Sequence, residues 1–344
     1  MALEPILIIA SFVDLCNFSI GPTQFLIVLE HKDSMQKSSD GTQLEETNWH
    51  VFTNPSTHNS AQEIHLFTPS IGALDVVAKN GTLWAAVETN YKHAAYLLKW
   101  NMESTDPFRI TQFDFLPIEI PKHIKASVQI PPKEDWSTTS LPSHEWLFNP
   151  HLAIVGENPV ICLNTADARA LLMQYSPSTR SFTVLFDREG LVEPVALSIE
   201  QKITLLGRMV SKPWSVFFNT RRYSTAKGPM LLPLGYVDGA RKVEVNLSKE
   251  FGLEPAYLFD VVELPSGRKV LSLISGLKEK PTLSMVVFNQ ERNKWIVASK
   301  IELQSIPIRC KLSVNDKGVA LAAIAFKEKA GYSVYSWTVE TGKI

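Results

Sequence analysis

The strongest structural signal in this sequence is an Asn-Gly pair placed between two apolar runs. Asn80-Gly81 follows Ala73–Val77 and precedes Leu83–Val87. A type I′ turn needs positive φ at both central residues, and Asn-Gly is the pair that adopts this conformation most readily. The stretch therefore predicts an antiparallel β-hairpin, and a third strand is expected at Ala95–Trp100.

The same order of apolar runs and turns returns along the whole chain. In most copies a short segment containing Gly, Asn, Asp or Ser separates two apolar runs, which is typical of strands joined by tight turns. The other expected strands are Pro5–Phe12, Phe25–Glu30 and Trp49–Thr53 in the first copy; Phe108–Phe113 as the fourth strand of the second; His151–Val155, Val160–Leu163, Ala170–Tyr175 and Phe182–Phe186 in the third; Pro194–Ser198, Ile203–Met209 and Trp214–Phe218 in the fourth; Pro255–Val262, Val270–Ile274, Leu283–Phe288 and Trp295–Ala298 in the fifth; and Pro307–Val314, Val319–Phe326 and Tyr332–Val339 in the sixth.

These copies have the spacing and the polarity of propeller blades. About six four-stranded units recur at roughly 45–75 residues, near the period of a blade with insertions. The inner strands are almost continuously apolar and the outer ones alternate, as expected for blades that pack on both faces. Proline, which is tolerated at the start of a strand, marks the first strand of five copies: Pro5, Pro150, Pro194, Pro255 and Pro307. The sequence predicts an all-β fold, a single β-propeller domain over residues 1–344 with six blades; a pair of β-sandwiches without a true repeat is the alternative.

The sixth copy is one strand short, and two segments interrupt the repeat. Met1–Ile9 could supply the missing strand, or the ring could close without it, and the sequence does not decide between them. The predicted insertions are residues 118–148, rich in Pro, Ser and Thr, and residues 220–248, which carry several basic side chains. Long connections in a compact domain are usually functional or disordered.

Composition excludes several classes of function. The chain has 344 residues and a net charge of -1, without the basic excess that nucleic-acid binding needs. Cys16, Cys162 and Cys310 are far apart and odd in number, so we expect reduced thiols, with neither a disulfide framework nor a cysteine-based zinc site. The eight histidines lack the short spacings of metal ligands, and no nucleophile elbow, P-loop or dinucleotide fingerprint occurs. We therefore expect no metal and no cofactor.

The N-terminal apolar run does not resemble a signal peptide. Ile6–Phe12 is short, Glu4 stands where a basic region would be, and Asp14 follows. The run is interpreted as a buried strand. No run reaches the length of a membrane span. Membrane insertion is therefore not expected, and a cytoplasmic location is favoured, with secretion as the alternative.

Ligands of propellers usually meet the mouth of the central channel. Its wall is made by the connections that enter the innermost strands and by those that join second to third strands. Mixed acids, bases and amides at these positions suit a polar ligand such as a sugar, although each one could also be an ordinary solvated loop residue. The residues predicted to bind the ligand are Asn90, Tyr91, Asp167, Arg169, Glu193, Lys212, Trp214 and Glu254.

Tryptophans divide into two expected groups. Exposed rings beside such groups would stack on the apolar face of a sugar, and the candidates are Trp136, Trp146 and Trp214. The others lie in strand runs and are expected to pack between blades; they are Trp84, Trp100, Trp295 and Trp337.

Stretches such as "VVAKNGTLWAAVE" and "KLSVNDKGVALAAIAF" resemble blades of sialidase-like and lectin-type β-propellers. The resemblance is one of pattern and covers most of the chain. Sialidases use an arginine triad, a Tyr–Glu nucleophile pair and an aspartic acid. "FRIT", residues 108–111, is similar to their F-R-I-P motif but lacks the proline, and "SVNDKGVA" lacks the tryptophan of their S-x-D-x-G-x-x-W box.

The resemblance implies Arg109, Arg208 and Arg309 as triad candidates if such an activity exists. Arginines in apolar strands also commonly reach solvent or pair with a carboxylate. The leading hypothesis is a non-catalytic recognition module that binds carbohydrate at the channel mouth. The alternatives are a sialidase-like glycoside hydrolase and a protein-interaction scaffold, so the expected partner is a glycan, another polar small molecule or a protein.

Overall fold

In the part of the chain that the structure describes, the strands form six four-stranded antiparallel sheets, which are the blades of a β-propeller. The predicted all-β, six-bladed fold is thereby confirmed. The structure is a computed structural model that describes residues 4–37, 43–55, 60–68, 71–79, 81–89, 94–101, 114–129, 144–167, 169–199, 202–209, 234–238, 243–264, 266–277, 280–289, 291–292 and 294–341.

The chain divides into two compact units. The first comprises Met1–Ala78, Thr89–Tyr91 and Leu258–Ile344, and the second comprises Lys79–Glu88 and Lys92–Tyr257. The predicted single domain over 1–344 stays a prediction. No helix in the described part of the chain has the length and apolar character needed to cross a membrane.

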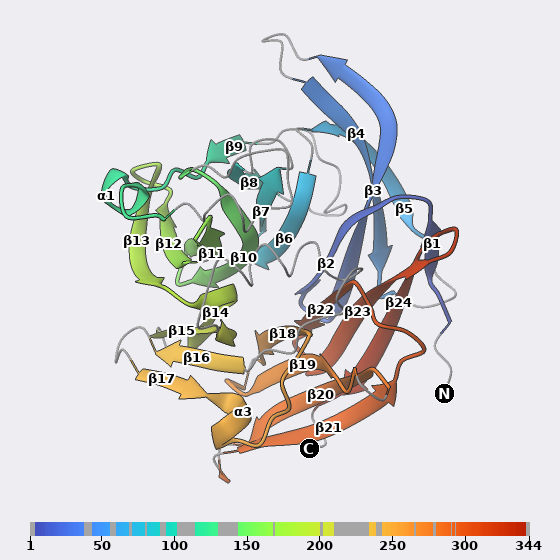
Figure 1. The fold of residues 1–344 in the computed structure, drawn as a ribbon. Helices are drawn as coiled ribbons and strands as arrows, with labels where there is room; N and C mark the ends of the chain where they lie inside the picture. Colours follow the sequence, from blue (N-terminus) through green and yellow to red (C-terminus); the bar gives the residue numbers. More distant parts are fainter. Residues whose placement is uncertain are drawn as a thin grey trace. The chain divides into compact units, whose positions relative to one another are not determined.

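The first unit holds three complete sheets (Figure 1). In sheet order these are β2 (Phe12–Ile20), β3 (Thr23–Lys37), β4 (Gln43–Thr53) and β5 (Gln62–Thr68); β18 (Leu258–Glu263), β19 (Lys269–Ser275), β20 (Thr282–Asn289) and β21 (Lys294–Glu302); and β22 (Arg309–Val314), β23 (Val319–Glu328), β24 (Gly331–Glu340) and β1 (Leu7–Ile9).

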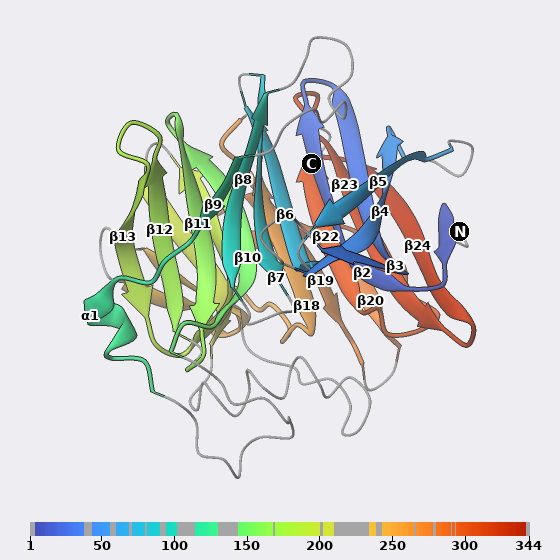
Figure 2. The same cartoon turned by 90° about the horizontal axis from the view of Figure 1, so that it is seen from above.

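The second unit holds two complete sheets and most of a third. Figure 2 shows the strands of one of them, β10 to β13, side by side. The sheets are β10 (Leu147–Val155), β11 (Asn158–Thr165), β12 (Ala170–Ser176) and β13 (Ser181–Arg188); β14 (Leu191–Ile199), β15 (Lys202–Met209), β16 (Leu234–Asp238) and β17 (Val243–Asn246); and β7 (Thr82–Thr89), β8 (Ala95–Asn101) and β9 (Asp114–Pro117), which follow β6 (Ile71–Lys79) in sheet order. Two short helices accompany them, α1 (Lys122–Lys125) and α3 (Leu247–Glu250).

The hairpin predicted from Asn80-Gly81 is confirmed. β6 and β7 are hydrogen-bonded neighbours, and Gly81 has a φ of 70°. The strands expected in the third, fifth and sixth copies are also present, each within a few residues of its predicted bounds. Inner strands are buried almost throughout, as in β11, whereas the outer strand β13 alternates between exposed and half-buried residues.

The first strand of the first blade was predicted wrongly. Pro5–Phe12 is not an inner strand, since β1 forms only three pairs, with β24 at the outer edge of the last blade, and Ile8 is 72% exposed. The strand that completes the sixth blade therefore comes from the N-terminal segment. The true inner strand is β2, whose polar residues disguise its burial: the side chain of Asn17 donates to the backbone oxygens of Lys311 (3.2 Å) and Leu321 (2.9 Å).

Two blades differ from the prediction in their outer strands. The expected strands Phe108–Phe113 and Trp214–Phe218 lie outside the described residues. The fourth strand of the second blade is β9, and the third and fourth strands of the fourth blade are β16 and β17. Both β16 and β17 lie within residues 220–248, so the described part of this predicted insertion belongs largely to the blade.

The prolines predicted to begin inner strands do not all occupy the same position in the structure. Pro150 and Pro194 stand inside β10 and β14, each at a shift of register, between Phe148 and His151 and between Val192 and Val195. A residue without an N–H group is tolerated there, because a bulge already interrupts the hydrogen-bond ladder. Pro5, predicted to open an inner strand, instead precedes the outermost strand of the last blade.

Candidate functional site

Two of the predicted ligand-binding residues meet at one turn of the second unit. The turn between β11 and β12 contains Asp167 and Arg169, and it is closed by a hydrogen bond from the Thr165 N–H to the Arg169 carbonyl (3.0 Å). Asp167 is 6% exposed. Its carboxylate accepts hydrogen bonds from the Thr165 hydroxyl and from the backbone N–H of Gln129 (3.2 Å), so it anchors the turn from inside.

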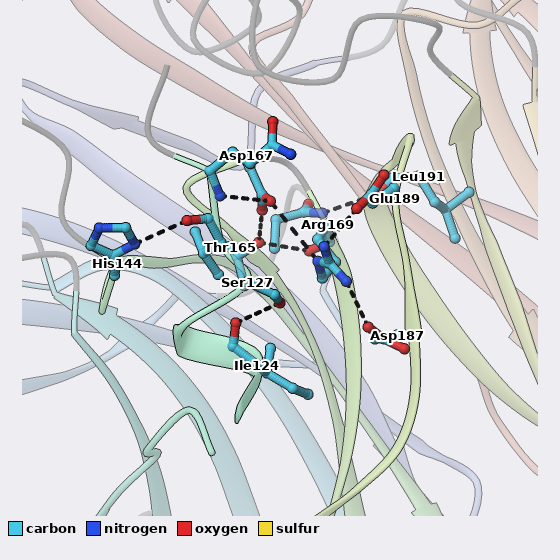
Figure 3. A network of polar contacts seen from close by, with 12 residues as sticks. Ile124, Ser127, His144, Thr165, Asp167, Arg169, Asp187, Glu189 and Leu191 are labelled. Atoms are coloured by element: carbon cyan, nitrogen blue, oxygen red, sulfur yellow. Dashed lines mark hydrogen bonds and ion pairs between the residues drawn. The ribbon is translucent and has the colours of Figure 1, made fainter. Parts of the chain in front are cut away.

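Arg169 extends from this turn across to the end of β13. Its Nη1 donates to Asp187 Oδ2 at 2.8 Å and its Nη2 donates to Glu189 Oε1 at 2.6 Å, while its Nε lies 3.9 Å from Asp167 Oδ2. Figure 3 shows these residues gathered around the guanidinium. We call Thr165, Asp167, Arg169, Asp187 and Glu189 the Arg169 network.

Exposure divides the Arg169 network into an inner and an outer part. The side chains of Asp167 and Arg169 are 6% and 12% exposed, whereas those of Asp187 and Glu189 are 44% and 61% exposed. The inner pair therefore fixes the outer carboxylates. Charge-assisted bonds of this kind orient a carboxylate more firmly than neutral ones.

An apolar cluster packs against the β11–β12 turn. Val128, Trp146, Phe148, Ala166 and Val192 pack together, and His144 Nδ1 lies 3.0 Å from the Val128 carbonyl oxygen. Trp146 is 8% exposed, and its ring meets that of Phe148 edge-on. Its predicted role as an exposed stacking platform is therefore wrong: the ring fills the core between the segment before β10 and the β11–β12 turn.

A second polar chain lies on the strands next to this turn. Asn149 has a φ of 52°, a left-handed conformation that Asn tolerates better than most residues. Its N–H donates to Glu88 Oε2 (3.1 Å), its side chain donates to Asn164 Oδ1 (3.4 Å), and Asn164 in turn donates to the Leu191 carbonyl (3.0 Å). This chain links β7, β10, β11 and β14 and holds their ends in one arrangement.

Among the other predicted ligand-binding residues, the structure describes the side chain of Glu254 alone. Glu254 is exposed ahead of β18 and takes no part in these contacts, and Glu193 lies in β14 with its side chain outside the described residues. Asn90, Tyr91, Lys212 and Trp214 lie outside the described residues, as does Trp136. The role of these residues stays a prediction.

The expected packing between blades is confirmed for Trp84, whereas the described contact of Trp295 lies within its own blade. Trp84 is buried against Tyr175, Trp295 meets Phe288, and Trp337 packs against the apolar core of the first unit. The side chain of Trp100 is outside the described residues.

Arg309, one of the three triad candidates, already has a carboxylate partner inside the first unit. Its Nε lies 2.7 Å from Asp14 Oδ1 and its Nη2 donates to Asp14 Oδ2 at 2.9 Å. Asp14, from β2, also accepts a hydrogen bond from the Leu74 N–H of β6 (2.8 Å). The side chains of Arg109 and Arg208 lie outside the described residues.

A buried lysine stands beside this pair on β22. Lys311 Nζ lies 3.5 Å from Asp75 Oδ1 of β6. Asp260 of β18 accepts from the Leu312 N–H (2.9 Å) and ties β18 to β22. Burial lowers the pKa of Lys311, but Asp75 and Asp260 outweigh it, so the pKa stays above its ordinary value. The lysine is therefore a fixed positive charge.

The sequence contained signals for the residues that were missed. Asp187 and Glu189 flank Arg188 just before Gly190, which has a φ of 74° and marks the turn into β14. The inner strands β2, β6 and β18 each carry an aspartate followed by Leu or Val, at Asp14, Asp75 and Asp260. Aligning the inner strands would have shown this repeat, but the wrong first strand of the first blade concealed it.

The thiols agree with the expectation of reduced cysteines. Cys16, Cys162 and Cys310 are free and buried. Burial, reinforced by Asp260 and only partly offset by a hydrogen bond between Ser272 and the thiol, raises the pKa of Cys310 to about 12. Within the described ranges, no group of three or more His, Cys, Asp or Glu side chains is placed to hold a metal ion.

Comparison with known proteins identifies the fold. No family model matches the sequence, and no curated protein matches it. Among solved structures, Trypanosoma rangeli sialidase superposes with a TM-score of 0.55 at 10% identity, over 95% of this chain and 54% of that one. The endosialidase of phage phi92 gives a TM-score of 0.60 at 9% identity, over 98% of this chain and 69% of that one.

A lectin has the same arrangement of blades. The SapL1 lectin, solved in complex with alpha methyl fucoside, superposes with a TM-score of 0.51 at 10% identity, over 98% of this chain and 97% of that one. The chain has a sialidase-like and lectin-like β-propeller fold. It spans about half the length of the Trypanosoma rangeli sialidase. At this identity the likeness of the propeller establishes its fold, and its activity has to be argued from its own residues.

Proposed function

We propose that this propeller is a non-catalytic recognition module that binds a glycan beside the Arg169 network. The observation that supports it best is the pair of exposed carboxylates, Asp187 and Glu189, held by one guanidinium. Carboxylate oxygens accept hydrogen bonds from sugar hydroxyls. Because Arg169 fixes them before a ligand arrives, binding loses little side-chain entropy.

The position of the Arg169 network in its blade also supports the proposal. One part lies on the turn from the second to the third strand, and the other lies at the end of the fourth strand, so both stand at the same end of the sheet. Propellers of this architecture include a lectin solved with a fucoside and a sialidase solved with sialic acid. By analogy with those proteins, we propose that the ligand of this propeller is also a sugar.

The hydrolase alternative has less support in the same residues. A glycoside hydrolase needs one carboxylic acid that gives a proton to the leaving oxygen and a second carboxylate that acts as base or nucleophile. Asp187 and Glu189 both accept hydrogen bonds from Arg169. Arg309, which a sialidase-like activity would need for the substrate, is engaged by Asp14.

A glycan array combined with a fluorogenic sialoside assay tests the proposal. We expect binding of glycans without turnover, loss of that binding in Arg169→Gln, and partial retention in Arg169→Lys. Arg292→Gln, on an exposed turn of the first unit, is the matched control and should bind like the wild type. Turnover of the sialoside would establish the hydrolase instead. The absence of both binding and turnover would refute the sugar ligand and favour a protein-interaction scaffold.

A further inference from the structure

The Arg169 network carries more negative than positive charge. Three carboxylates, from Asp167, Asp187 and Glu189, face a single guanidinium, which leaves two negative charges in excess. Arg188 lies between the outer two in sequence, but successive side chains of a strand point to opposite faces, so it projects from the other side of β13. A ligand at the outer carboxylates therefore meets a negative potential.

The two outer carboxylates also keep acceptor capacity. Asp187 uses Oδ2 and Glu189 uses Oε1 for Arg169, and within the described residues neither side chain contacts another charged group. The second oxygen of each remains to accept hydrogen bonds, and both belong to half-exposed or exposed side chains. Hydroxyl groups can donate to such oxygens, whereas a ligand carboxylate cannot.

We infer that the Arg169 network selects uncharged, hydroxyl-rich sugars and discriminates against sugars that carry a carboxylate, such as sialic acid. This inference rests on the glycan-binding function proposed above and names its ligand class. Arg169 is a positioning residue here, since its side chain is 12% exposed and its guanidinium is engaged by the carboxylates of the protein itself. The ligand contacts are assigned to Asp187 and Glu189.

The expected selectivity is modest and depends on salt. Two unit charges about 8 Å from a ligand carboxylate, in the dielectric of water, weaken its binding about fivefold. At physiological ionic strength the Debye length is about 8 Å, and screening reduces the effect to about twofold. A preference that shrinks in this way with salt distinguishes electrostatic exclusion from a steric clash, which salt leaves unchanged.

The test compares one glycan with and without its terminal sialic acid, using the wild-type protein at low and at physiological salt. We expect the form without sialic acid to bind about fivefold more tightly at low salt and about twofold more tightly at physiological salt. Asp187→Asn combined with Glu189→Gln keeps the size of both side chains and removes both charges, and should abolish the preference. Glu302→Gln, at an exposed ion pair with Lys280 in the first unit, should keep it.

The outcomes separate the two proposals. Equal or tighter binding of the sialylated form by the wild type, or a preference that survives in the double variant, overturns the inference but leaves glycan recognition standing. Failure of the wild type to bind any glycan overturns the proposed function, and the ligand class with it. An unfolding transition at the wild-type temperature would show that the double variant is folded, as expected for exposed side chains.

Discussion

Replacement of Lys311 by methionine should destabilise the first unit far more than an equivalent change at the surface. Lys311 and Asp75 are 9% and 10% exposed in their side chains, and Asp260 is 3% exposed. Methionine has nearly the volume of lysine without its charge, so the variant removes the positive charge that Asp75 and Asp260 stabilise. The expected result is a large loss of unfolding free energy with little change in packing.

The magnitude follows from the separation of the charges. At the effective dielectric constant of about 20 that suits protein sites, two unit charges 3.5 Å apart interact by about 5 kcal/mol. Removing one partner of a buried pair costs about 3 to 5 kcal/mol in measured cases, because the other charge stays buried. We therefore expect Lys311→Met to lower the unfolding free energy by about 4 kcal/mol.

Guanidinium unfolding followed by tryptophan fluorescence measures the loss. Lys280→Met is the control: Lys280 lies only 3.0 Å from Glu302, but their side chains are 70% and 67% exposed. Exposed pairs contribute between about 0 and 1 kcal/mol, so the control should unfold at almost the wild-type denaturant concentration. Adding Asp75→Asn to Lys311→Met should recover part of the lost unfolding free energy, since it removes the buried carboxylate charge that faced Lys311.

The pH dependence gives a further check. The pKa of Lys311 is raised in the folded protein. Its contribution is therefore fully present below the pKa of an unfolded lysine, about 10.4, and is lost as pH rises through the folded value. The deficit of Lys311→Met should be constant between pH 6 and pH 9. The reasoning is refuted if Lys311→Met unfolds at the same denaturant concentration as Lys280→Met.

Two further predictions concern packing. The three buried thiols should resist iodoacetamide at pH 8 in the native protein and react on unfolding, as mass spectrometry would show; fast native labelling of Cys310, whose pKa is about 12, would contradict this. Gly331→Ala would drive a Cβ into the Ile9 carbonyl oxygen, so it should detach β1 and speed hydrogen exchange at Leu7–Ile9. Gly81→Ala, also at a positive φ but where a Cβ meets nothing within 4 Å, should not affect β1.

The parts of the fold that the sequence predicted well are those fixed by short-range chemistry. The hairpin at Asn80-Gly81 and the Asx turn at Asn315, whose side chain accepts from the Lys317 and Val319 N–H groups, depend on residues close together in the chain. Such turns locate their flanking strands whatever the tertiary context. The strands of the third, fifth and sixth blades followed from turns of this kind.

The first blade was misread because burial there depends on distant partners. Ile6–Phe12 is apolar and looked buried, but its strand is an edge strand. No strand was predicted beyond Phe12, in the stretch that contains Asp14 and Asn17. Both side chains are buried, and their hydrogen bonds reach Leu74, Lys311 and Leu321. Contacts over such separations leave no local pattern in the sequence.

The candidate site was predicted in part for a related reason. Asp167 and Arg169 were found because they lie on a turn that hairpin rules place at the end of a blade. The direction of the Arg169 side chain could not be predicted, since it depends on Asp187 and Glu189, which come at the end of β13, later in the chain. The sequence therefore located the turn correctly but could not show that its arginine reaches the end of β13, where the exposed carboxylates lie.

The pairing of β1 with β24 has a consequence for the order in which the protein is made. Leu7 lies opposite Val334, which is translated 327 positions later in the chain. At typical rates of synthesis this interval is on the order of half a minute. Until β24 has been made, Leu7–Ile9 have no strand to pair with. Closure of the last blade is thus a late step of folding, which waits until both β1 and β24 have left the ribosome.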